Sequence, residues 1–225
     1  MDEELERRAA LHAALGEPVR LAIVEQLAVS DRAPSGLSIQ FDLPGNLLAH
    51  HLDVLERVGL IERTVSAGDR RRRYVRLRHQ ALGDVGVGRV RRRAGRALFV
   101  CTHNSARSQL AAALWRHRTG DDATSAGTHP TERVHPGAVA AARRAGLELN
   151  DAVPRPLEDG DLDAAVIVTV CDRAYEELDT PVDWLHWSIA DPLEAGTRRA
   201  FDAALAELDD RITAIAPETT RPTTG

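Results

Sequence analysis

The sequence predicts two domains: a mostly helical N-terminal domain that ends in a β-hairpin, and a C-terminal α/β domain with a doubly wound parallel sheet. Residues 1–96 hold 17 arginines and 13 acidic residues, a net charge of +4, whereas residues 97–225 hold 12 arginines and 21 acidic residues, a net charge of −9. Helical periodicity dominates the first half, and short apolar runs alternate with helical stretches in the second. Two halves of opposite charge are expected to meet different partners.

The elements of the first half follow from apolar spacing and from helix-breaking residues. Gly16 is expected to end the first helix, Pro18 to open the second, and Gly59 to end the last. The helices are predicted at residues 5–15, 18–29, 35–40 and 47–58, and the domain is expected to cover residues 1–80. Residues 60–65 and 70–77 then read as two strands joined by a turn that contains Gly68.

This order of helices and hairpin is that of a winged helix-turn-helix. Residues 16–23 (Gly-Glu-Pro-Val-Arg-Leu-Ala-Ile) and residues 50–61 resemble the ArsR-type repressors. The resemblance implies a DNA-binding homodimer formed through this domain, with the fourth helix in the major groove. The residues expected near the bases are Asn46, Leu47, Ala49 and His50. The arginines expected on phosphates or in the minor groove are Arg70, Arg71, Arg72 and Arg73.

Two observations limit this interpretation. A basic hairpin that is merely solvated would explain the four arginines equally well. Many arsenic-sensing members of the ArsR family bind arsenite through clustered cysteines in this domain, but residues 1–96 contain no cysteine. A soft ion such as arsenite therefore lacks its preferred ligands in the first half. Residues 81–96, with four glycines and five arginines, are predicted to form a flexible or partly helical linker.

The second half, residues 97–216, alternates strands with helices, which predicts a parallel sheet with helices on both faces. The strands are expected at residues 97–100, 123–128, 164–170 and 184–189, and the helices at 109–117, 135–145, 173–178 and 197–215. Ligands in such sheets bind beyond the carboxyl ends of the strands. Cys101, Cys171 and Asp191 each follow a strand, so we expect them at one edge. Residues 217–225 are predicted to be a disordered tail.

The stretch that carries the chemistry lies between the first of these strands and its helix. It reads Cys101, Thr102, His103, Asn104, Ser105, Ala106, Arg107, Ser108. Backbone N–H groups of such a loop converge, and the helix N-terminus adds positive potential, which makes a cradle for a tetrahedral oxyanion. Cys101 would be the nucleophilic thiolate, Arg107 would grip two oxygens, and Ser108 would donate to the sulfur. A structural cysteine beside an unrelated arginine is the alternative.

The loop resembles the phosphate-binding loop of the low-molecular-weight protein tyrosine phosphatase superfamily, and the resemblance runs from about residue 97 to about residue 215. Ala106 stands where the phosphatases usually carry a second cysteine, and Gln109 where they tend to have proline, so the loop is closer to the arsenate reductase branch. The resemblance implies a flavodoxin-like strand order. It also implies that Asp191, before Pro192, is the general acid. A plain Asp-Pro turn is the alternative.

Cys171 distinguishes a reductase from a phosphatase, because a reductase must take two electrons from thiols. Cys171 could attack a Cys101–arsenate adduct and form a disulfide. Thioredoxin-linked reductases have a further cysteine near the place of Leu178 in this chain. Either the Cys101–Cys171 disulfide forms, or a small thiol such as mycothiol or glutathione attacks the adduct. A small buried hydrophobe is the alternative interpretation of Cys171.

We therefore expect an arsenate reductase fused to a DNA-binding regulator, in arsenic detoxification. A phosphatase fused to a DNA-binding domain and a non-catalytic, oxyanion- or arsenite-sensing repressor are the alternatives. No bound cofactor or metal is expected, and the external reductant would be mycothiol, thioredoxin or glutathione–glutaredoxin. The chain has no run of 18 apolar residues and begins with charged residues, so we expect no membrane span and a cytoplasmic location.

Overall fold

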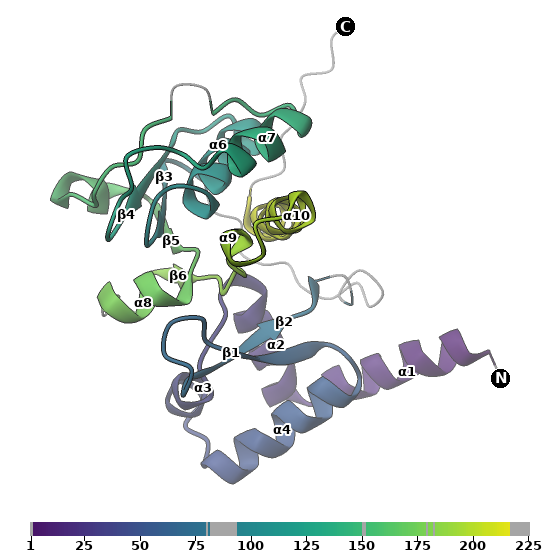
Figure 1. Cartoon of the computed structure of the whole chain (residues 1–225). Helices are drawn as coiled ribbons and strands as arrows, with labels where there is room; N and C mark the ends of the chain where they lie inside the picture. The colour runs from purple at the N-terminus through teal and green to yellow at the C-terminus, as the bar shows by residue number, and fades with distance from the viewer. Residues whose placement is uncertain are drawn as a thin grey trace, which may run out of the picture. The chain divides into compact units, whose positions relative to one another are not determined.

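The structure is a computed structural model that describes residues 2–79, 81, 94–149, 152–178, 180, 181 and 183–216. The chain divides into two compact units, Met1–Val90 and Arg91–Gly225 (Figure 1). The predicted linker lies largely outside the described residues, and the predicted disordered tail, residues 217–225, lies wholly outside them.

The first unit is mostly helical and ends in an antiparallel hairpin, as the sequence predicts. Its elements are α1 (Glu3–Leu15), α2 (Pro18–Val29), α3 (Pro34–Gln40), α4 (Gly45–Arg57), β1 (Ile61–Val65) and β2 (Arg73–Leu77). The register pairs Ile61 with Leu77 and Val65 with Arg73. The second strand begins three residues later than predicted. Arg32, after α2, forms an isolated bridge with Val75 on the other side of β2.

Local sequence signals account for the ends of these helices. Pro18 occupies the first turn of α2, and the Glu17 side chain accepts hydrogen bonds from the N–H groups of Val19 and Arg20 at 3.1 and 2.9 Å. These bonds satisfy donors that the first helical turn leaves without partners. Gly59, after α4, has φ of +79°, a conformation that glycine adopts without strain. The chain can therefore turn directly from α4 into β1.

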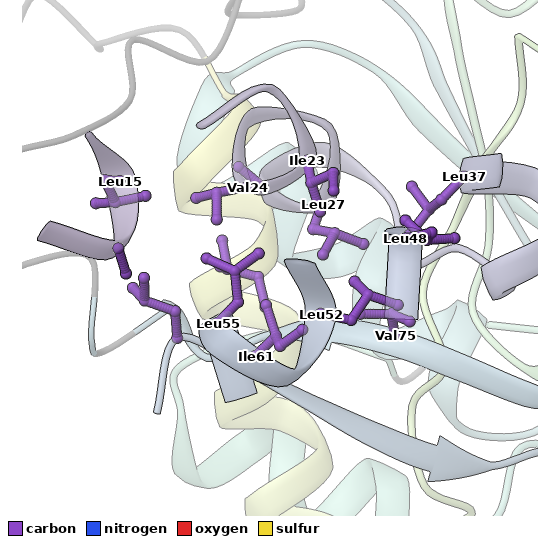
Figure 2. Packing of buried hydrophobic residues seen from close by; sticks show 14 of the residues in the cluster. Leu15, Ile23, Val24, Leu27, Leu37, Leu48, Leu52, Leu55, Ile61 and Val75 are labelled. Atoms are coloured by element: carbon purple, nitrogen blue, oxygen red, sulfur yellow. The ribbon is translucent and has the colours of Figure 1, made fainter. Parts of the chain in front are cut away.

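A single apolar cluster holds the first unit together. Its residues come from all four helices and both strands, and Figure 2 shows part of it. The side chains labelled there are Leu15, Ile23, Val24, Leu27, Leu37, Leu48, Leu52, Leu55, Ile61 and Val75. Each buried leucine or isoleucine contributes about 1.5–3 kcal/mol relative to an exposed one. The buried face of α4 leaves its opposite face to solvent.

The second unit is the predicted α/β domain with a parallel sheet. Its strands are β3 (Ala97–Cys101), β4 (Ala123–Gly127), β5 (Val166–Thr169) and β6 (Leu185–His186), in the spatial order β4-β3-β5-β6. All three strand pairs are parallel. Numbered within the unit, the order is 2-1-3-4, the beginning of the flavodoxin-type order. The last strand has two residues rather than the predicted six.

Helices surround this sheet. They are α6 (Arg107–Thr119), α7 (Pro136–Arg144), the 3-10 helix η1 (Asp159–Asp163), α8 (Asp172–Leu178), α9 (Pro192–Ala195) and α10 (Arg198–Ile215). The short elements η1 and α9 were not expected from the sequence. Helices α6, α7 and α10 pack on one another, and α8 packs on β3 and β5 (Figure 1). Among the described residues, no helix is long and apolar enough to cross a bilayer.

The packing fixes where the chemistry can lie. All five residues of β3 are buried, as expected for a strand covered on both faces. The ring of Phe99 lies 6.1 Å from that of Trp115 on α6 and 6.0 Å from that of Trp187 after β6. Because the strands are parallel, the ends at Cys101, Gly127, Thr169 and His186 lie at one edge of the sheet.

Candidate active site

The loop between β3 and α6 turns its carbonyl groups away from Cys101. Four carbonyl oxygens accept hydrogen bonds of 2.8–3.1 Å from N–H groups after β4: Cys101 from Thr128, Thr102 from His129, His103 from Thr131, and Ser105 from His135. In a trans peptide the next N–H points the opposite way, so the N–H groups that follow these four carbonyls point away from the segment after β4. The Asn104 N–H donates to Cys101 Sγ at 3.2 Å. The loop therefore has the geometry of an oxyanion cradle.

Asn104 holds this loop in shape. Its φ is +49° and its side chain is completely buried; asparagine tolerates this left-handed conformation better than most residues. Its Oδ1 accepts from the backbone N–H of Arg155 at 3.0 Å and from Gln109 Nε2 at 3.1 Å. Its Nδ2 donates to Ser108 Oγ at 2.8 Å and to Ser125 Oγ at 2.9 Å. The side chain is thus satisfied on every side.

The direction of the Ser108 hydrogen bond follows from this network. The Arg155 N–H can only donate, so it fixes Oδ1 of Asn104 and leaves Nδ2 to donate to Ser108 Oγ. Ser108 Oγ lies 3.0 Å from Cys101 Sγ. While its oxygen accepts from Asn104, the hydroxyl keeps its hydrogen and is able to donate to the sulfur. The Ser108 hydroxyl and the Asn104 N–H therefore both lie within hydrogen-bond distance of Cys101 Sγ.

Arg155 is itself held by an ion pair that was not predicted from the sequence. Its guanidinium makes two bonds to the Asp161 carboxylate, of 2.7 and 2.6 Å. These hydrogen bonds from Arg155 hold the pKa of Asp161 below its usual value. The bidentate pair ties η1 to the segment whose backbone supports Asn104.

Gly127, the last residue of β4, lets the loop lie close to the sheet. A Cβ atom at this position would lie 2.7 Å from the Thr102 carbonyl oxygen and 3.0 Å from the Asn104 Cβ. The first contact is well inside the normal van der Waals distance. The loop's position therefore depends on glycine here.

Arg107 and Asp191 form an ion pair, a contact that was not expected from the sequence. Arg107 Nη2 donates to Asp191 Oδ2 at 2.7 Å, and Nη1 donates to the Ile189 carbonyl at 2.9 Å. Asp191 Oδ1 accepts from the Leu193 N–H at 3.0 Å, so the carboxylate also caps α9. Arg107 is buried, at 7% exposed. Arg107 is the first residue of α6, and these two hydrogen bonds hold its guanidinium in a fixed orientation.

Cys171 lies against the same loop. Its Sγ is 3.4 Å from Thr102 Oγ1 and 3.5 Å from the N–H of Ala174, which donates to it. Burial raises the pKa of the Cys171 thiol, an effect opposed by the positive charge of Arg107 and reinforced by the nearby Cys101. Both cysteines are reduced, and they are only 3% and 2% exposed. The structure thus brings two thiols and an arginine to one edge of the sheet.

A buried polar network that the sequence did not reveal lies next to Cys171. His186, at the end of β6, places Nε2 3.1 Å from Asp172 Oδ1 and Nδ1 3.0 Å from Thr169 Oγ1. Its ring stacks on Tyr175 with a centroid distance of 4.1 Å. His186, Thr169 and Asp172 are at most 3% exposed. The only sequence signal was a histidine at the end of an apolar strand, which alone predicts nothing.

The residues expected to meet DNA lie in the first unit. Asn46, Leu47, Ala49 and His50 on α4, and Arg70 to Arg73 on the hairpin, are all exposed. Arg71 makes two bonds to the Asp69 carboxylate, of 3.0 and 3.1 Å, which raise the pKa of Arg71. Within the part of the chain that the structure describes, no group of three or more His, Cys, Asp or Glu side chains could hold a metal ion.

Comparison with known proteins decides the family of the second unit. Residues 96–222, more than half of the chain, match the family described as low molecular weight phosphotyrosine protein phosphatase. The chain belongs to this family. The prediction of a thiol-dependent enzyme domain of the low-molecular-weight phosphatase type is therefore confirmed.

Several relatives in the family are named as arsenate reductases. One from Bacillus licheniformis is 32% identical over 121 residues, which are 51% of this chain and 86% of that protein. A putative arsenate reductase from Halobacterium salinarum is 32% identical over 102 residues, 42% of this chain and 72% of that protein. Among solved structures, a low molecular weight protein tyrosine phosphatase from T. tengcongensis is 22% identical over 54% of this chain and 97% of its own, with a TM-score of 0.49.

Proposed function

We propose that the second unit is an arsenate reductase in which Cys101 is the nucleophile and Cys171 the resolving thiol. The observation that carries the proposal is the placement of Cys171 Sγ 3.4 Å from the side chain of Thr102, the residue next to the nucleophile. Phosphatase chemistry needs only one cysteine, whereas a reductase needs a second thiol that can reach the first. The names of the curated relatives support the same reaction.

The first step forms a sulfur–arsenic bond. Arsenate binds between Arg107 and the N–H groups of the loop, and Arg107 moves its Nη2 donor from Asp191 to an arsenate oxygen. Cys101 Sγ attacks arsenic, and one oxygen leaves as water with a proton from Asp191. The Ser108 hydroxyl and the Asn104 N–H hold the thiolate until the bond forms. Arsenic is still pentavalent at this stage.

The second step is the reduction. Cys171 loses its proton and attacks Cys101 Sγ; the sulfur–arsenic bond breaks, its electron pair stays on arsenic, and arsenite leaves. The two thiols have supplied two electrons and become a Cys101–Cys171 disulfide. The full sequence has only these two cysteines, so an external thiol must reduce the disulfide. Mycothiol, thioredoxin and glutathione–glutaredoxin are the candidates.

Arsenite production by the full-length, reduced protein tests this proposal. Wild type, Cys101→Ser and Cys171→Ser would be given arsenate with each thiol system in turn, with an aryl phosphate as a second substrate. We expect no turnover of either substrate by Cys101→Ser, and aryl phosphate cleavage without arsenite formation by Cys171→Ser. Brisk aryl phosphate cleavage by wild type with no arsenite from any thiol system would assign the domain to phosphatase chemistry instead.

We propose further that the first unit is an ArsR-type winged helix that binds DNA as a homodimer in the cytoplasm. Three observations support it: the order of four helices and a hairpin, the bridge of Arg32 to Val75 that adds a third strand segment, and the exposure of the residues predicted for DNA. In helix α1, residue 3 and residues 5–10 are exposed, and the side chain of Leu5 is 53% exposed. This apolar side chain is available for contact with a second copy of the chain.

DNA selection with the full-length protein tests this second proposal. A random duplex library would be selected, and binding to the enriched sequence compared with binding to a scrambled duplex of equal length. Asn46→Ala and His50→Ala are each expected to weaken only the selected sequence, by about 1–3 kcal/mol. Sedimentation would report whether the protein is a dimer. No enrichment, or a monomer in complex with one half-site, would overturn the proposal in this form.

A further inference from the structure

We infer that His186 is a positioning residue for Cys171: it fixes the first turn of α8 and so holds the thiol against the nucleophile loop. The inference rests on the proposed reductase function and assigns a role to a residue outside the oxyanion cradle. Cys171 directly precedes α8, and both anchors of that helix, Asp172 and Tyr175, contact the His186 ring.

The direct polar contacts of the Cys171 sulfur are weak ones. Thr102 Oγ1 at 3.4 Å and the Ala174 N–H at 3.5 Å involve sulfur, a poor hydrogen-bonding atom. The position of the thiol must therefore come mainly from the backbone that carries it. The backbone is held at the next residue, Asp172, whose Oδ1 lies 3.1 Å from His186 Nε2.

His186 is suited to fix an orientation, because it is held on three sides. Its two ring nitrogens have partners on different elements, Thr169 on β5 and Asp172 on α8. Its face stacks on Tyr175 with an interplanar angle of 13°. A planar ring with one partner at each nitrogen and a third on its face has one orientation that satisfies all of them. The ring therefore transmits the position of the sheet to the start of α8.

Burial of this pair is costly, so packing alone does not explain it. His186 and Asp172 are 0% and 3% exposed, and two apolar side chains of similar volume would fill the space without the desolvation of a carboxylate. What an apolar pair would not supply is a directed link between β6 and the residue after Cys171.

The reaction makes this precision necessary. A disulfide requires the two sulfurs to approach to about 2.05 Å with a narrow range of dihedral angles. A misplacement of about 1 Å in a reacting group can cost about 100-fold in rate. The step served by His186 is attack of Cys171 on Cys101 Sγ, whereas attack of Cys101 on an oxyanion uses the loop and Arg107 and no side chain of α8.

The opposite end of α8 provides a matched control. Glu177 accepts a hydrogen bond of 2.9 Å from Thr128 Oγ1 and lies 2.5 Å from His129 Nε2. Loss of this exposed link would loosen α8 at its last turn without touching the turn beside Cys171. Glu177→Ala removes this link, so if any loosening of α8 sufficed, Glu177→Ala and His186→Phe would have the same effect.

The experiment compares two reactions in full-length variants. Aryl phosphate hydrolysis reports Cys101 chemistry. Disulfide formation reports the reaction of Cys171. It is measured by rapid quenching, alkylation and mass spectrometry at set times after arsenate is added. In a separate arm, diamide replaces arsenate, because it oxidises thiols without arsenic. Tryptophan fluorescence checks the fold, because all three tryptophans of the chain, Trp115, Trp184 and Trp187, lie in the second unit.

We expect His186→Phe, which keeps the stacked ring, to slow disulfide formation by about 30- to 100-fold in both arms and to change aryl phosphate hydrolysis by less than about threefold. Thr169→Val is the milder variant, should His186→Phe fail to fold, and should slow the same step by about tenfold. Asp172→Asn keeps an acceptor for His186 Nε2, so its rate of disulfide formation should lie within about fivefold of wild type. Glu177→Ala should form the disulfide at the wild-type rate.

Three results would overturn the inference: unchanged disulfide formation in the folded His186 and Thr169 variants, an equal loss in Glu177→Ala, or a parallel loss of aryl phosphate hydrolysis. Failure of the proposed function looks different. In that case arsenate gives no disulfide in wild type, while diamide still does, and the comparison of variants in the diamide arm still decides the role of His186. If diamide gives no Cys101–Cys171 disulfide in wild type, the inference is also wrong.

Discussion

Replacement of Gly127 by alanine is expected to damage the site without adding any new chemistry. The new Cβ would lie 2.7 Å from the Thr102 carbonyl oxygen, 3.0 Å from the Asn104 Cβ and 3.1 Å from the Asn104 nitrogen. Two of these three atoms are backbone atoms of the loop, so no flexible side chain can move aside. The loop must move by roughly 0.7 Å to reach an ordinary contact distance.

The size of the effect can be worked out from these contacts. Overpacking of this kind costs about 1–3 kcal/mol, and the lower entropy of the unfolded alanine chain returns about 0.4–1 kcal/mol. We therefore expect a net loss of about 1–2 kcal/mol in the free energy of unfolding of the second unit. The shift also strains the bond of the Thr102 carbonyl to the His129 N–H, now 2.8 Å.

The activity should fall more than the stability suggests. The displaced atoms include the Asn104 nitrogen, which donates to Cys101 Sγ at 3.2 Å. A displacement of this order in a group that orients a nucleophile is expected to cost about 10- to 100-fold in kcat/KM. Both substrates, arsenate and an aryl phosphate, should be affected alike, because both reactions begin at Cys101.

The assay is urea unfolding followed by tryptophan fluorescence, together with steady-state kinetics. Gly160→Ala is the matched control, since a Cβ at Gly160, in the same unit, meets nothing within 4 Å; it should leave both quantities near wild type. A Gly127→Ala protein with wild-type stability and kcat/KM would refute the reasoning, because the loop would then not depend on its close contact with β4.

Three further predictions concern charge. Arg107→Lys keeps the charge but loses the planar fork, and should lower kcat/KM for both substrates by about 100- to 1000-fold; steady-state rates within threefold of wild type would contradict this. Burial raises the pKa of the Cys171 thiol, so the fraction of Cys171 present as thiolate grows as the pH rises. The single-turnover rate of disulfide formation should therefore increase by up to about tenfold per pH unit between about pH 6.5 and 8.5. A rate that does not change with pH would count against Cys171 as the attacking thiol. Arg72→Gln should reduce the steepness of the plot of log K for DNA binding against log salt concentration by about 1. The guanidinium of Arg71 already pairs with Asp69, so Arg71→Gln should reduce it less. Equal slopes in salt titrations of the two variants would refute this difference.

The sequence was most informative at the loop that begins with Cys101, because the residues before and after this loop also show a recognisable pattern. The apolar run before Cys101 and the helix after Arg107 predicted the strand, the loop and the helix in their correct order. Asp191 was expected at the same edge as Cys101 because parallel strands end at a common edge, but its ion pair with Arg107, 84 residues away in the sequence, was not expected. Boundaries were less certain, because β6 has only two residues and no periodicity can be read from them.

Contacts between segments could not be predicted in the same way. Asn104 has partners at Ser125 and Arg155 that are distant in the sequence, and nothing in a single chain says which polar side chains will face each other. The network of His186 was missed for the same reason. A histidine on an apolar strand becomes informative only when the sheet pairs it with Thr169 and places the start of α8 beside it.

The distribution of cysteine constrains how the two units could work together. All thiol chemistry of the chain lies in the second unit, since Cys101 and Cys171 are its only cysteines and the first unit has none. Arsenite prefers thiolate ligands, so the first unit cannot take up arsenite in the way that clustered cysteines allow. If the first unit binds DNA as proposed and responds to arsenic, the response must arise from the state of the second unit: oxyanion bound at Arg107, or the Cys101–Cys171 disulfide formed. In the disulfide case, DNA affinity should change on oxidation of wild type and stay constant on oxidation of Cys171→Ser; equal behaviour of the two proteins in binding titrations would exclude the disulfide as the signal.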